Sequence, residues 1–387
     1  MRQALPRIAL MLGNLATGVS ILAPAGMLTV LADGLHVGIR DTGLLVTFGA
    51  IILCIGSPLV AWATTTIDRR LLLTATLAVL VIGQAASAFA SGYGEVLALR
   101  LVMLAVAAVY TPQAASTVAL IVPEKSRAAA IAFVFLGWSL AVAGGLPLVT
   151  LIAEHLGWRA AYGAAALTAL VPCVVGFVTL PANLRGAPLS LQSFNIIARH
   201  RKILLLLAIT LLSTSGQFTV FVYLSPLLRE LAGADANLVG LFFAAYGVAG
   251  FLGNVLASRI VGALGPWRTS VVFLGSVGLG MAIWALASGS IAAMGAGVTI
   301  WGLGFAAINS MQQARLAATA PALASVSIAL NTSVLYVGQA VGSGIGGLLF
   351  AAEYLHAMGY AGVAFVASAW IPLALTWESK TKRVSAP

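Results

Sequence analysis

Charged residues are scarce in this sequence. Only 8% of the 387 residues are Asp, Glu, Lys or Arg, whereas 61% are hydrophobic and the mean hydropathy is +1.05. A soluble domain carries about 25% charged residues. A protein core cannot bury this much apolar surface, so a lipid bilayer must be the solvent for most of the chain.

Residue types that do catalysis or bind metals are also few. The two cysteines, Cys54 and Cys173, lie in separate apolar segments without metal-ligand spacing, and we expect them to be packing residues. The four histidines fall in loops or at segment ends. There is no Gly-rich phosphate loop with a following lysine and no nucleophile with a plausible base. The sequence therefore predicts no enzyme, no metal site and no cofactor.

The apolar residues form twelve segments separated by short polar breaks. Most are close to the ~20 residues that a helix needs to cross a bilayer. The first is too long for a signal-peptide core and is followed by more spans, so we interpret it as a transmembrane helix. Backbone groups in lipid must be bonded internally, which makes all of them helices. The segments are 8–31, 42–63, 71–90, 96–121, 128–153, 160–180, 203–228, 238–258, 269–287, 292–314, 324–350 and 361–377.

The net charge of +10 does not indicate nucleic acid, because the basic residues lie in the connections between apolar segments. Their distribution predicts cytoplasmic termini in an inner membrane, with Arg40, Arg159 and Arg229 outside. The sixteen basic residues expected inside are Arg2, Arg7, Arg69, Arg70, Lys125, Arg127, Arg185, Arg199, Arg201, Lys202, Arg259, Arg268, Arg315, Lys380, Lys382 and Arg383.

The chain divides into two halves. The connection 181–202 is the longest, contains Pro181 and Pro188, and predicts a cytoplasmic linker between six-helix bundles at 1–180 and 203–387. Gly137, Gly145 and His155 recur at one constant offset as Gly338, Gly346 and His356. Parallel six-helix repeats are a known transporter plan with the substrate site between them. The expected fold is an all-α membrane protein with twelve transmembrane helices in two six-helix pseudo-repeats.

Arg100 is the one basic residue that we place clearly within an apolar segment. A buried arginine in a span usually faces a bundle interior or a water-filled cavity. Other polar and aromatic residues are predicted to line a substrate pocket with it, although many such side chains only hold helices together. The predicted pocket residues are Asn14, Thr17, Arg100, Tyr110, Gln113, Trp138, Gln217, Phe218, Tyr223, Tyr246, Asn309, Gln312 and Tyr336. A largely apolar pocket with a few amides suits an uncharged or amphipathic small molecule.

Small residues, prolines and basic residues near segment ends predict gating elements. Glycines allow close helix approach, proline bends a helix, and basic residues at the cytoplasmic end bond helix carbonyls or acids. Positive-inside anchoring or ordinary helix packing explains the same residues without gating. The predicted gating residues are Gly56, Asp68, Arg69, Arg70, Gly144, Gly145, Pro147, Gly253 and Arg259.

These motifs resemble the major facilitator superfamily, in the twelve-helix drug:proton antiporter branch near the arabinose and sugar-efflux permeases. The likeness covers nearly the whole chain. Its residues include the loop from Gly56 to Arg70, Arg100 in the fourth helix, Gly144 to Pro147 followed by Gly157-Trp158-Arg159, Tyr223 to Pro226, Gln313 to Arg315, and Asn331 to Ser333. The resemblance implies a monomeric transporter in the lipid bilayer, driven by proton exchange and without ATP.

One departure concerns proton coupling. Relatives usually carry a glutamate in the first helix, where this chain has Ile21. A proton-coupled carrier needs a group that changes protonation between the two sides, usually a buried acid. Asp33, Asp41 and Glu95 are the candidates that remain, and each is equally a solvated loop acid. Asp41 or Glu95 is also a possible partner for Arg100.

The sequence thus predicts a secondary transporter that exports a small organic solute or drug by alternating access, with exchange for protons left open. The alternative is a uniporter or uptake permease for a neutral solute without proton coupling. A third reading, from another class, is a lipid-handling or receptor-like membrane protein of the same fold.

Overall fold

The computed structural model describes residues 4–64, 67–123, 127–185, 197, 199–320 and 323–377, and every regular element within them is a helix. Most of the predicted linker, at 186–196 and 198, lies outside the described residues, as do Arg2, Lys125, Lys380, Lys382 and Arg383 of the charge pattern. The predicted all-α fold is confirmed.

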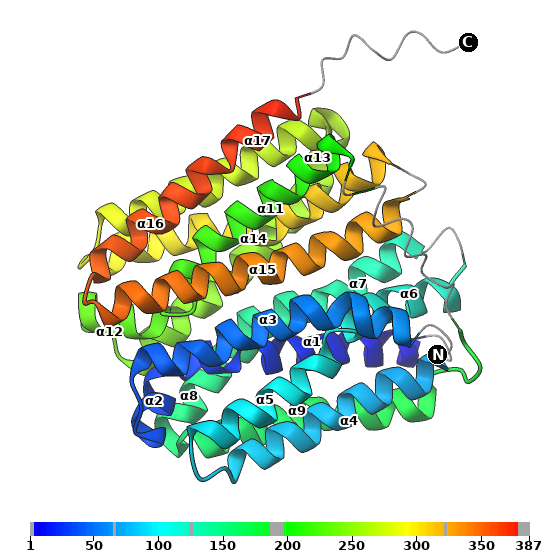
Figure 1. Cartoon of the computed structure of the whole chain (residues 1–387), viewed down its shortest axis with the longest axis horizontal. Coiled ribbons are helices and arrows are strands. Elements are labelled where there is room, and N and C mark those ends of the chain that lie inside the picture. Colours follow the sequence, from blue (N-terminus) through cyan, green and yellow to red (C-terminus); the bar gives the residue numbers. More distant parts are fainter. Residues whose placement is uncertain are drawn as a thin grey trace.

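The first half of the chain forms six spans, several of which are broken into two or three helices (Figure 1). They are α1 (Ala4–Gly26) with α2 (Leu28–Leu35), α3 (Ile39–Ala63), α4 (Arg69–Ala88), α5 (Tyr93–Ala107) with α6 (Tyr110–Ile121), α7 (Arg127–Leu140) with the π-helix η2 (Ala141–Gly145) and α8 (Leu146–Leu156), and α9 (Trp158–Thr179).

The second half repeats this plan. Its elements are α11 (Arg201–Phe221) with α12 (Leu224–Ala232), α13 (Ala236–Leu286), α14 (Ile291–Thr319), α15 (Ala324–Ala351), and α16 (Leu355–Ser368) with α17 (Trp370–Leu375). The 51-residue α13 contains Gly265 at φ 79° and ψ 159°, followed by Pro266. Glycine adopts this positive-φ backbone conformation without strain. The chain turns back at Gly265, so α13 consists of two spans. The eleven described helices that are long and apolar enough to cross a membrane therefore supply twelve spans, as predicted.

One boundary corrects the sequence analysis. The tenth segment was predicted to end at residue 314, but α14 continues to Thr319 and carries Arg315 inside it. Arg315 is 6% exposed and donates to the hydroxyl and carbonyl oxygens of Thr376. Arg100 is therefore not the only buried arginine within a span. Hydropathy alone stopped the segment at the charge, whereas the bond to Thr376 allows the helix to continue.

The internal repeat is visible in how the glycines pack. A Cβ on Gly137 would lie 2.2 Å from the Met11 carbonyl oxygen of α1, and a Cβ on Gly338 would lie 2.8 Å from the Leu211 carbonyl oxygen of α11. In each half, the fifth span therefore packs closely on the first at an equivalent glycine. Gly145 repeats the contact against Val19, and so does Gly346 against the Thr219 carbonyl.

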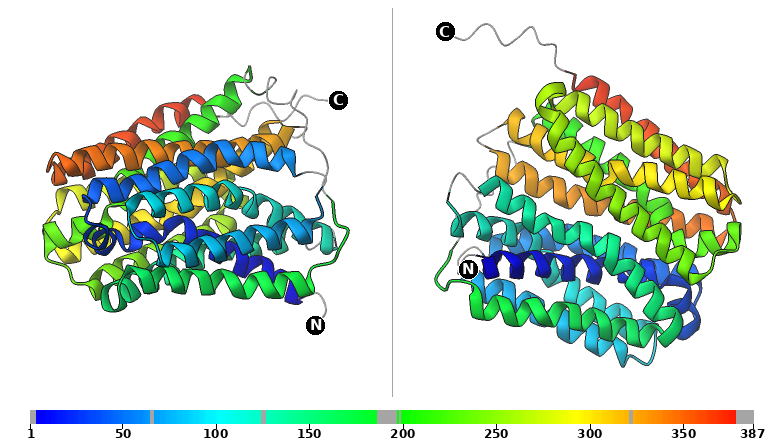
Figure 2. Two further views of the ribbon diagram at one scale, coloured as in Figure 1. Left: turned by 60° about the horizontal axis from the view of Figure 1, so that its bottom comes forward. Right: turned by 180° about the vertical axis from the view of Figure 1, so that it is seen from behind.

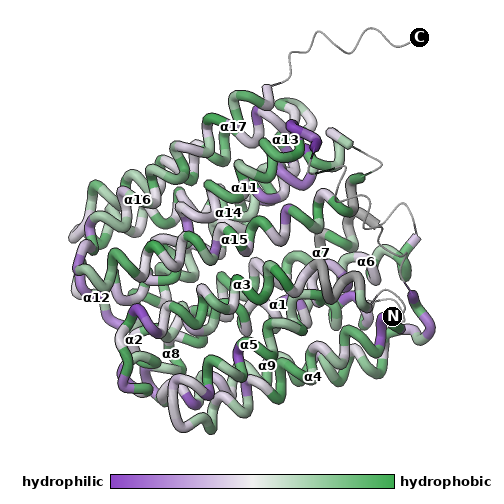
Figure 3. The backbone as a smooth tube through the Cα atoms, in the orientation of Figure 1, coloured by the Kyte–Doolittle hydropathy of each residue, from purple (hydrophilic) through white to green (hydrophobic). Residues whose placement is uncertain are grey.

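The two halves meet along two seams, α3 beside α15 and α8 with η2 beside α13 (Figures 1 and 2). The start of α1 and the end of α17 lie at one end of the bundle, called here the terminal end, and α2 and α12 lie at the other, the distal end (Figure 1). Hydrophobic residues dominate the middle of the helices, and hydrophilic residues gather toward the two ends (Figure 3). This banding is the pattern expected of helices that cross a bilayer.

Candidate functional site

Arg100 ties three helices together. Its side chain is 1% exposed and donates from Nε to the Leu45 carbonyl (2.7 Å), from Nη1 to Ser20 (3.1 Å) and from Nη2 to Ile21 (2.6 Å). All three acceptors are backbone oxygens, on α3 and α1. Of the two settings that the sequence left open, the bundle interior is the one in which Arg100 lies. It acts as a clamp inside the first half.

The clamp exists because of a proline. Pro24 lies within α1 and has no amide hydrogen, so the Ser20 carbonyl four residues earlier loses its helical donor. Arg100 supplies that donor. Gly49 on α3 leaves room, since a Cβ there would lie 3.3 Å from the arginine Nε and 2.6 Å from Leu104. Pro24 four residues after Ser20 was the sequence signal for this role, and it was missed.

The three candidate coupling acids lie away from the clamp. Asp33, Asp41 and Glu95 are all exposed, and Glu95 accepts from the backbone and hydroxyl of Ser91 at 2.8 and 3.0 Å. Within the described part of the chain, Arg100 donates to carbonyls and no carboxylate side chain is buried. An exposed acid keeps ordinary solvation, which is a poor setting for a proton carrier in mid-membrane.

A polar chain crosses the first half near its centre. The Trp138 indole donates to the Thr111 hydroxyl (3.2 Å), which donates to the Asn14 side-chain oxygen (2.7 Å), and the Asn14 amide donates to the Val134 carbonyl (3.1 Å). Trp138 is half-buried and Asn14 is fully buried. These bonds join α1, α6 and α7. Asn14 is thus committed to helix packing, while Trp138 keeps an accessible surface.

The other predicted first-half residues are held locally. The Thr17 hydroxyl donates to the Gly13 carbonyl of its own helix (2.8 Å), and the buried Tyr110 hydroxyl lies against Gly13. The Gln113 side-chain oxygen accepts from Ser116 at 3.3 Å. The structure brings the Tyr110 hydroxyl of α6 beside Gly13, which precedes Asn14 on α1. The hydrogen bonds described for Asn14, Thr17 and Gln113 stay within the first half.

An aromatic cluster forms the matching centre of the second half. The Gln217 side-chain oxygen accepts from the Trp301 indole (2.9 Å) and the Tyr246 hydroxyl (3.5 Å), and its amide donates to the Ser213 carbonyl (3.1 Å). The Tyr246 and Trp301 rings meet at 5.0 Å, and Phe218 joins them through Phe221. Gln217, Phe218 and Tyr246, predicted separately, are therefore brought together by α11, α13 and α14.

Replacing Gln217 by leucine is expected to destabilise the second half by about 1–3 kcal/mol, because the buried Trp301 and Tyr246 donors lose their acceptor. Tryptophan fluorescence during thermal unfolding in detergent would measure this loss as a lower unfolding midpoint. Thr299→Ala is the control, since the Thr299 hydroxyl is exposed and bonds only its own helix at Gly295. Equal unfolding midpoints for the two variants would contradict the role of Gln217.

A second amide network lies between α11, α14 and α15. Thr210 donates to the Asn331 oxygen (2.6 Å), and the Asn331 amide donates to the Asn309 oxygen (2.9 Å). Gln312, one turn along α14 from Asn309, is fully buried with neither side-chain atom hydrogen-bonded. Tyr336 on α15 is buried as well. Buried amide atoms without partners are costly and mark places where water or a polar ligand is expected.

Two polar contacts between side chains cross between the halves in the described part of the chain. At the α3–α15 seam, the Thr47 and Ser343 hydroxyls lie 2.8 Å apart. Tyr223 reinforces this seam: its hydroxyl donates to the Ser343 carbonyl (3.1 Å) and occupies the space beside Gly43 of α3. Tyr223, predicted to line the pocket, thus contacts both halves.

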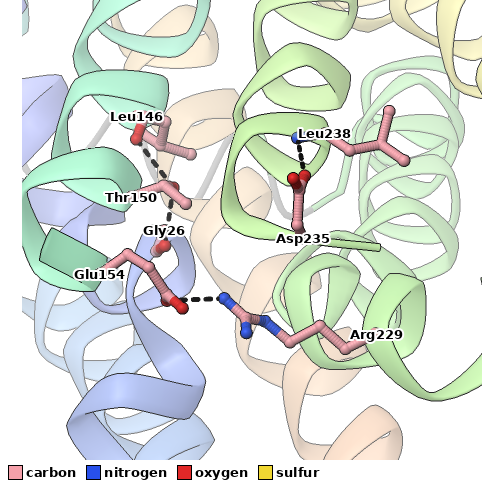
Figure 4. A network of polar contacts seen from close by, with 7 residues as sticks. All are labelled: Gly26, Leu146, Thr150, Glu154, Arg229, Asp235 and Leu238. Carbon is pink, nitrogen blue, oxygen red and sulfur yellow. Dashed lines mark hydrogen bonds and ion pairs between the residues drawn. The ribbon is translucent and has the colours of Figure 1, made fainter. Parts of the chain in front are cut away.

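The second contact closes the distal end. Glu154 on α8 and Arg229 on α12 form an ion pair of 2.7 Å, as Figure 4 shows. Nearby, the Thr150 hydroxyl donates to the carbonyls of Gly26 (2.7 Å) and Leu146 (3.0 Å), and Asp235 caps the start of α13 at Leu238 (2.8 Å). The pair was missed because the sequence places both residues in loops where partners cannot be assigned.

Single charge reversals at Glu154 or Arg229 are expected to weaken closure of the distal end, and exchanging the two charges is expected to restore it. The two side chains are 26% and 31% exposed, so the pair contributes at most about 1 kcal/mol. Glu154→Arg or Arg229→Glu alone sets like charges together and weakens distal closure a few-fold, and the double swap recovers it. Double electron–electron resonance between spin labels on the two halves measures closure. Additive losses in the double swap would contradict the pairing.

The predicted gating residues fall into separate places. Gly56 packs against the Ala105 carbonyl of α5, and Gly253 against Leu303 of α14, each within one half. Asp68 caps α4 through the Leu71 amide (3.1 Å), the Arg69 amide donates to the Leu184 carbonyl (2.8 Å), and Arg70 lies 4.5 Å over the Phe177 ring. Arg259 is exposed, and Gly144 has open space where a Cβ would be.

Gly145 and Pro147 lie just after a region where the fifth span meets α13 of the other half. There α13 presses Gly247 onto the π-helix: a Cβ on Gly247 would lie 2.3 Å from the Ala143 nitrogen and 2.4 Å from its Cα. Gly240 faces Pro147 and Leu151 more loosely, at 3.9 Å. The π-helix, before a proline that lacks an amide hydrogen, is thus a contact point between halves.

The chain matches the family model for the Major Facilitator Superfamily over residues 8–343. It is 28% identical over 369 residues to an uncharacterized MFS-type transporter, YbcL, of Bacillus subtilis, covering 95% of this chain and 94% of the relative. It is 27% identical over 349 residues to the inner membrane transport protein YdhP of Escherichia coli (90% and 89%). It is also 26% identical over 357 residues to a probable sugar efflux transporter of Mannheimia succiniciproducens (92% and 88%).

Among solved structures, the fold matches a bacterial homologue of the human lysosomal transporter Spinster, in an inward-facing and unoccupied conformation. The TM-score is 0.75 at 14% identity, over 97% of this chain and 96% of that one. This likeness confirms the predicted twelve-helix fold.

Proposed function

The chain belongs to the Major Facilitator Superfamily, and we propose that it exports a small, uncharged organic solute across the inner membrane by alternating access between its two halves. The observation that carries this proposal is where the halves touch. Thr47 and Ser343 lie in the distal halves of α3 and α15, Gly247 lies in the distal half of the first span of α13, and Glu154–Arg229 lies at the distal end. Contacts gathered at one end of two repeated bundles suit a carrier that opens its ends in turn.

The distal end is proposed to face the outside. The positive-inside rule assigns the termini to the cytoplasm, and the distal contacts then make this the inward-facing state. The fold likeness to a transporter solved inward-facing supports this assignment. Both halves lie in one chain, and the proposal needs one copy to transport.

The solute is proposed to be neutral and to bind between the central networks of the two halves. Trp138 offers an aromatic surface, while Asn309 and the unpartnered amide of Gln312 offer hydrogen bonds. No Asp or Glu within the described residues is buried as a whole residue to receive a cationic drug. Of the three described buried arginines of the spans, Arg100 and Arg315 donate to protein oxygens, and Arg69 is the first residue of α4. Amides with aromatic rings suit hydroxyl-bearing solutes such as sugars, in line with the name of the sugar-efflux relative.

A facilitator without proton coupling is the second candidate, and one observation favours it. Ile21 replaces the usual first-helix acid, and the carbonyl of Ile21 accepts from Arg100, so a backbone group fills the arginine's bonding need. A carrier without a titrating group moves its solute down the solute gradient alone.

Reconstituted liposomes with a trapped pH dye test both candidates. A gradient of sugars, nucleosides or amphipathic drugs is imposed in turn, and solute flux and internal pH are recorded together. Solute flux with a pH change supports exchange for protons, and Asp33, Asp41 and Glu95 are then neutralised one at a time. Flux without a pH change supports the facilitator. A protein that moves none of these solutes, while spin labels show it folded, would contradict the proposal.

A further inference from the structure

The outer face of the first half carries two hollows between α4 and α9. The larger, of about 620 Å³, is lined by Val81, Ala85, Ala88, Phe89, Arg159, Gly163, Ala166, Leu167 and Leu170. The smaller, of about 340 Å³, continues toward the terminal end between Leu71 and Val178 and has no charged residue in its lining. Neither belongs to the seams between the halves.

The larger hollow faces the lipid. The α4 and α9 helices pack on α1, α5 and α8 of their own half and form one edge of the bundle in Figure 1. Phe89 is 88% exposed and Leu167 is 63% exposed. Side chains so apolar and so exposed in a transmembrane segment are solvated by acyl chains.

The shape of the hollow follows from residue size. Ala85 and Ala88 of α4 face Gly163 and Ala166 of α9, so the floor is made of small residues. Phe89, Leu167 and Leu170 form the rims. A Cβ at Gly163 would meet nothing within 4 Å. This groove runs along the helices, as a lipid tail does, and is open on its outer side.

The distal end of the groove carries two opposite charges. Arg159 donates to the Ala90 carbonyl at 3.1 Å and lies 4.2 Å over the Trp158 ring. Glu95 accepts from the amide of Ser91, the other side of the same peptide unit, at 2.8 Å. The C=O and N–H of a trans peptide point in opposite directions, so one peptide holds the two charges apart. No ion pair joins them within the described residues.

We propose that this groove binds one aminophospholipid of the distal leaflet, such as phosphatidylethanolamine. One acyl chain lies over Ala85, Ala88 and Gly163, the phosphate contacts the guanidinium of Arg159, and the ammonium contacts the carboxylate of Glu95. A zwitterionic headgroup satisfies both charges, whereas a singly anionic headgroup satisfies Arg159 alone and meets Glu95 with a like charge.

Native mass spectrometry of the detergent-purified, delipidated full chain tests this. Phosphatidylethanolamine or phosphatidylglycerol with matched acyl chains is titrated in, and the fraction of protein that carries one bound lipid is measured at each concentration. We expect phosphatidylethanolamine to bind more tightly. Arg159→Gln, which removes one charged contact, is expected to weaken it about tenfold. Gly163→Leu, whose Cβ meets nothing within 4 Å and whose side chain would occupy the groove, is expected to weaken phosphatidylethanolamine binding by a similar factor.

Gly262→Leu on α13 is the matched control, since a Cβ there also meets nothing within 4 Å. It should leave lipid binding unchanged. Glu95→Gln should remove the preference for phosphatidylethanolamine over phosphatidylglycerol. Unchanged lipid binding in Gly163→Leu would show that the groove is not the binding site. Equal binding of the two lipids by the unmodified chain would contradict the headgroup assignment. If Arg159→Gln fails to fold, Gly163→Leu and Glu95→Gln still decide both points.

Discussion

Replacing Arg100 by methionine is expected to cost about 3–5 kcal/mol of folding free energy and to remove most of the correctly folded protein. Methionine matches the length of the arginine stem but donates no hydrogen bond. The carbonyls of Ser20, Ile21 and Leu45 then lose their shared donor inside a 1%-exposed site. The Ser20 carbonyl, which Pro24 deprives of its helical donor, then bears its full desolvation cost, while the Ile21 and Leu45 carbonyls each lose one bond.

The proline in α1 makes this prediction specific. Pro24→Ala gives residue 24 an amide hydrogen, which can donate to the Ser20 carbonyl as in an ordinary helix. The Arg100→Met loss should therefore be smaller in the Pro24→Ala background by about 1 kcal/mol. The folding free energy of Arg100→Lys should lie between those of the unmodified protein and Arg100→Met. Lysine brings a charge and donors but lacks the planar guanidinium group that reaches two helices at once.

Thermal unfolding of detergent-purified protein and size-exclusion profiles of a fluorescent fusion measure both effects. Arg70→Met is the control, because Arg70 lies at a helix start over the Phe177 ring and its loss leaves no buried carbonyl. If the Arg100 and Pro24 losses are simply additive, the arginine does not serve the proline break. If Arg100→Met has an unchanged unfolding temperature but no longer transports solute, Arg100 acts in transport directly, and its structural role as a clamp is contradicted.

Arg100 also shows how far the sequence alone could go. A single arginine in an apolar stretch is conspicuous, so its importance was predictable from hydropathy. Its partners were not, because backbone carbonyls carry no sequence signature, whereas the acids Asp41 and Glu95 are conspicuous in the sequence. Twelve helices, in contrast, follow from segment length and composition, since lipid leaves a polar backbone few other conformations.

The interior networks behave in the same way. Gln217, Tyr246 and Phe218 were each identified as unusual residues in a span, but their convergence with Trp301 depends on the rotation of three helices. Small errors in that rotation separate these side chains, and residue spacing on separate helices does not fix it. The seams between the halves were still harder to predict from the sequence, because Gly247 and Thr47 look like ordinary packing residues in an apolar run.

Replacing Gly247 by alanine is the second change expected to have a large effect, here on conformation instead of folding. The new Cβ would lie 2.3 Å from the Ala143 nitrogen and 2.7 Å from the Val142 carbonyl carbon. These are backbone atoms of the π-helix and cannot rotate aside. Relieving the overlap costs about 1–3 kcal/mol, enough to shift an equilibrium between two conformations roughly 5- to 150-fold.

That cost applies only while the halves are in contact at this seam. Each half keeps its own core, so the variant should remain folded and open at the distal end, with transport reduced at least several-fold. Spin labels at Asp33 of α2 and Glu230 of α12, both exposed, measure the opening after Cys54 and Cys173 are replaced by alanine. The distance distribution should shift to longer values.

Gly240→Ala is the matched control on the same seam, because its Cβ would lie 3.9 Å from Pro147 and Leu151 and fits without movement. A folded Gly247→Ala protein with an unchanged distance distribution would show that the seam yields without opening. The contrast between these two glycines separates a gate from ordinary helix packing. Packing alone predicts that both substitutions are absorbed within one conformation, whereas alternating access predicts that only the one against the π-helix moves the equilibrium.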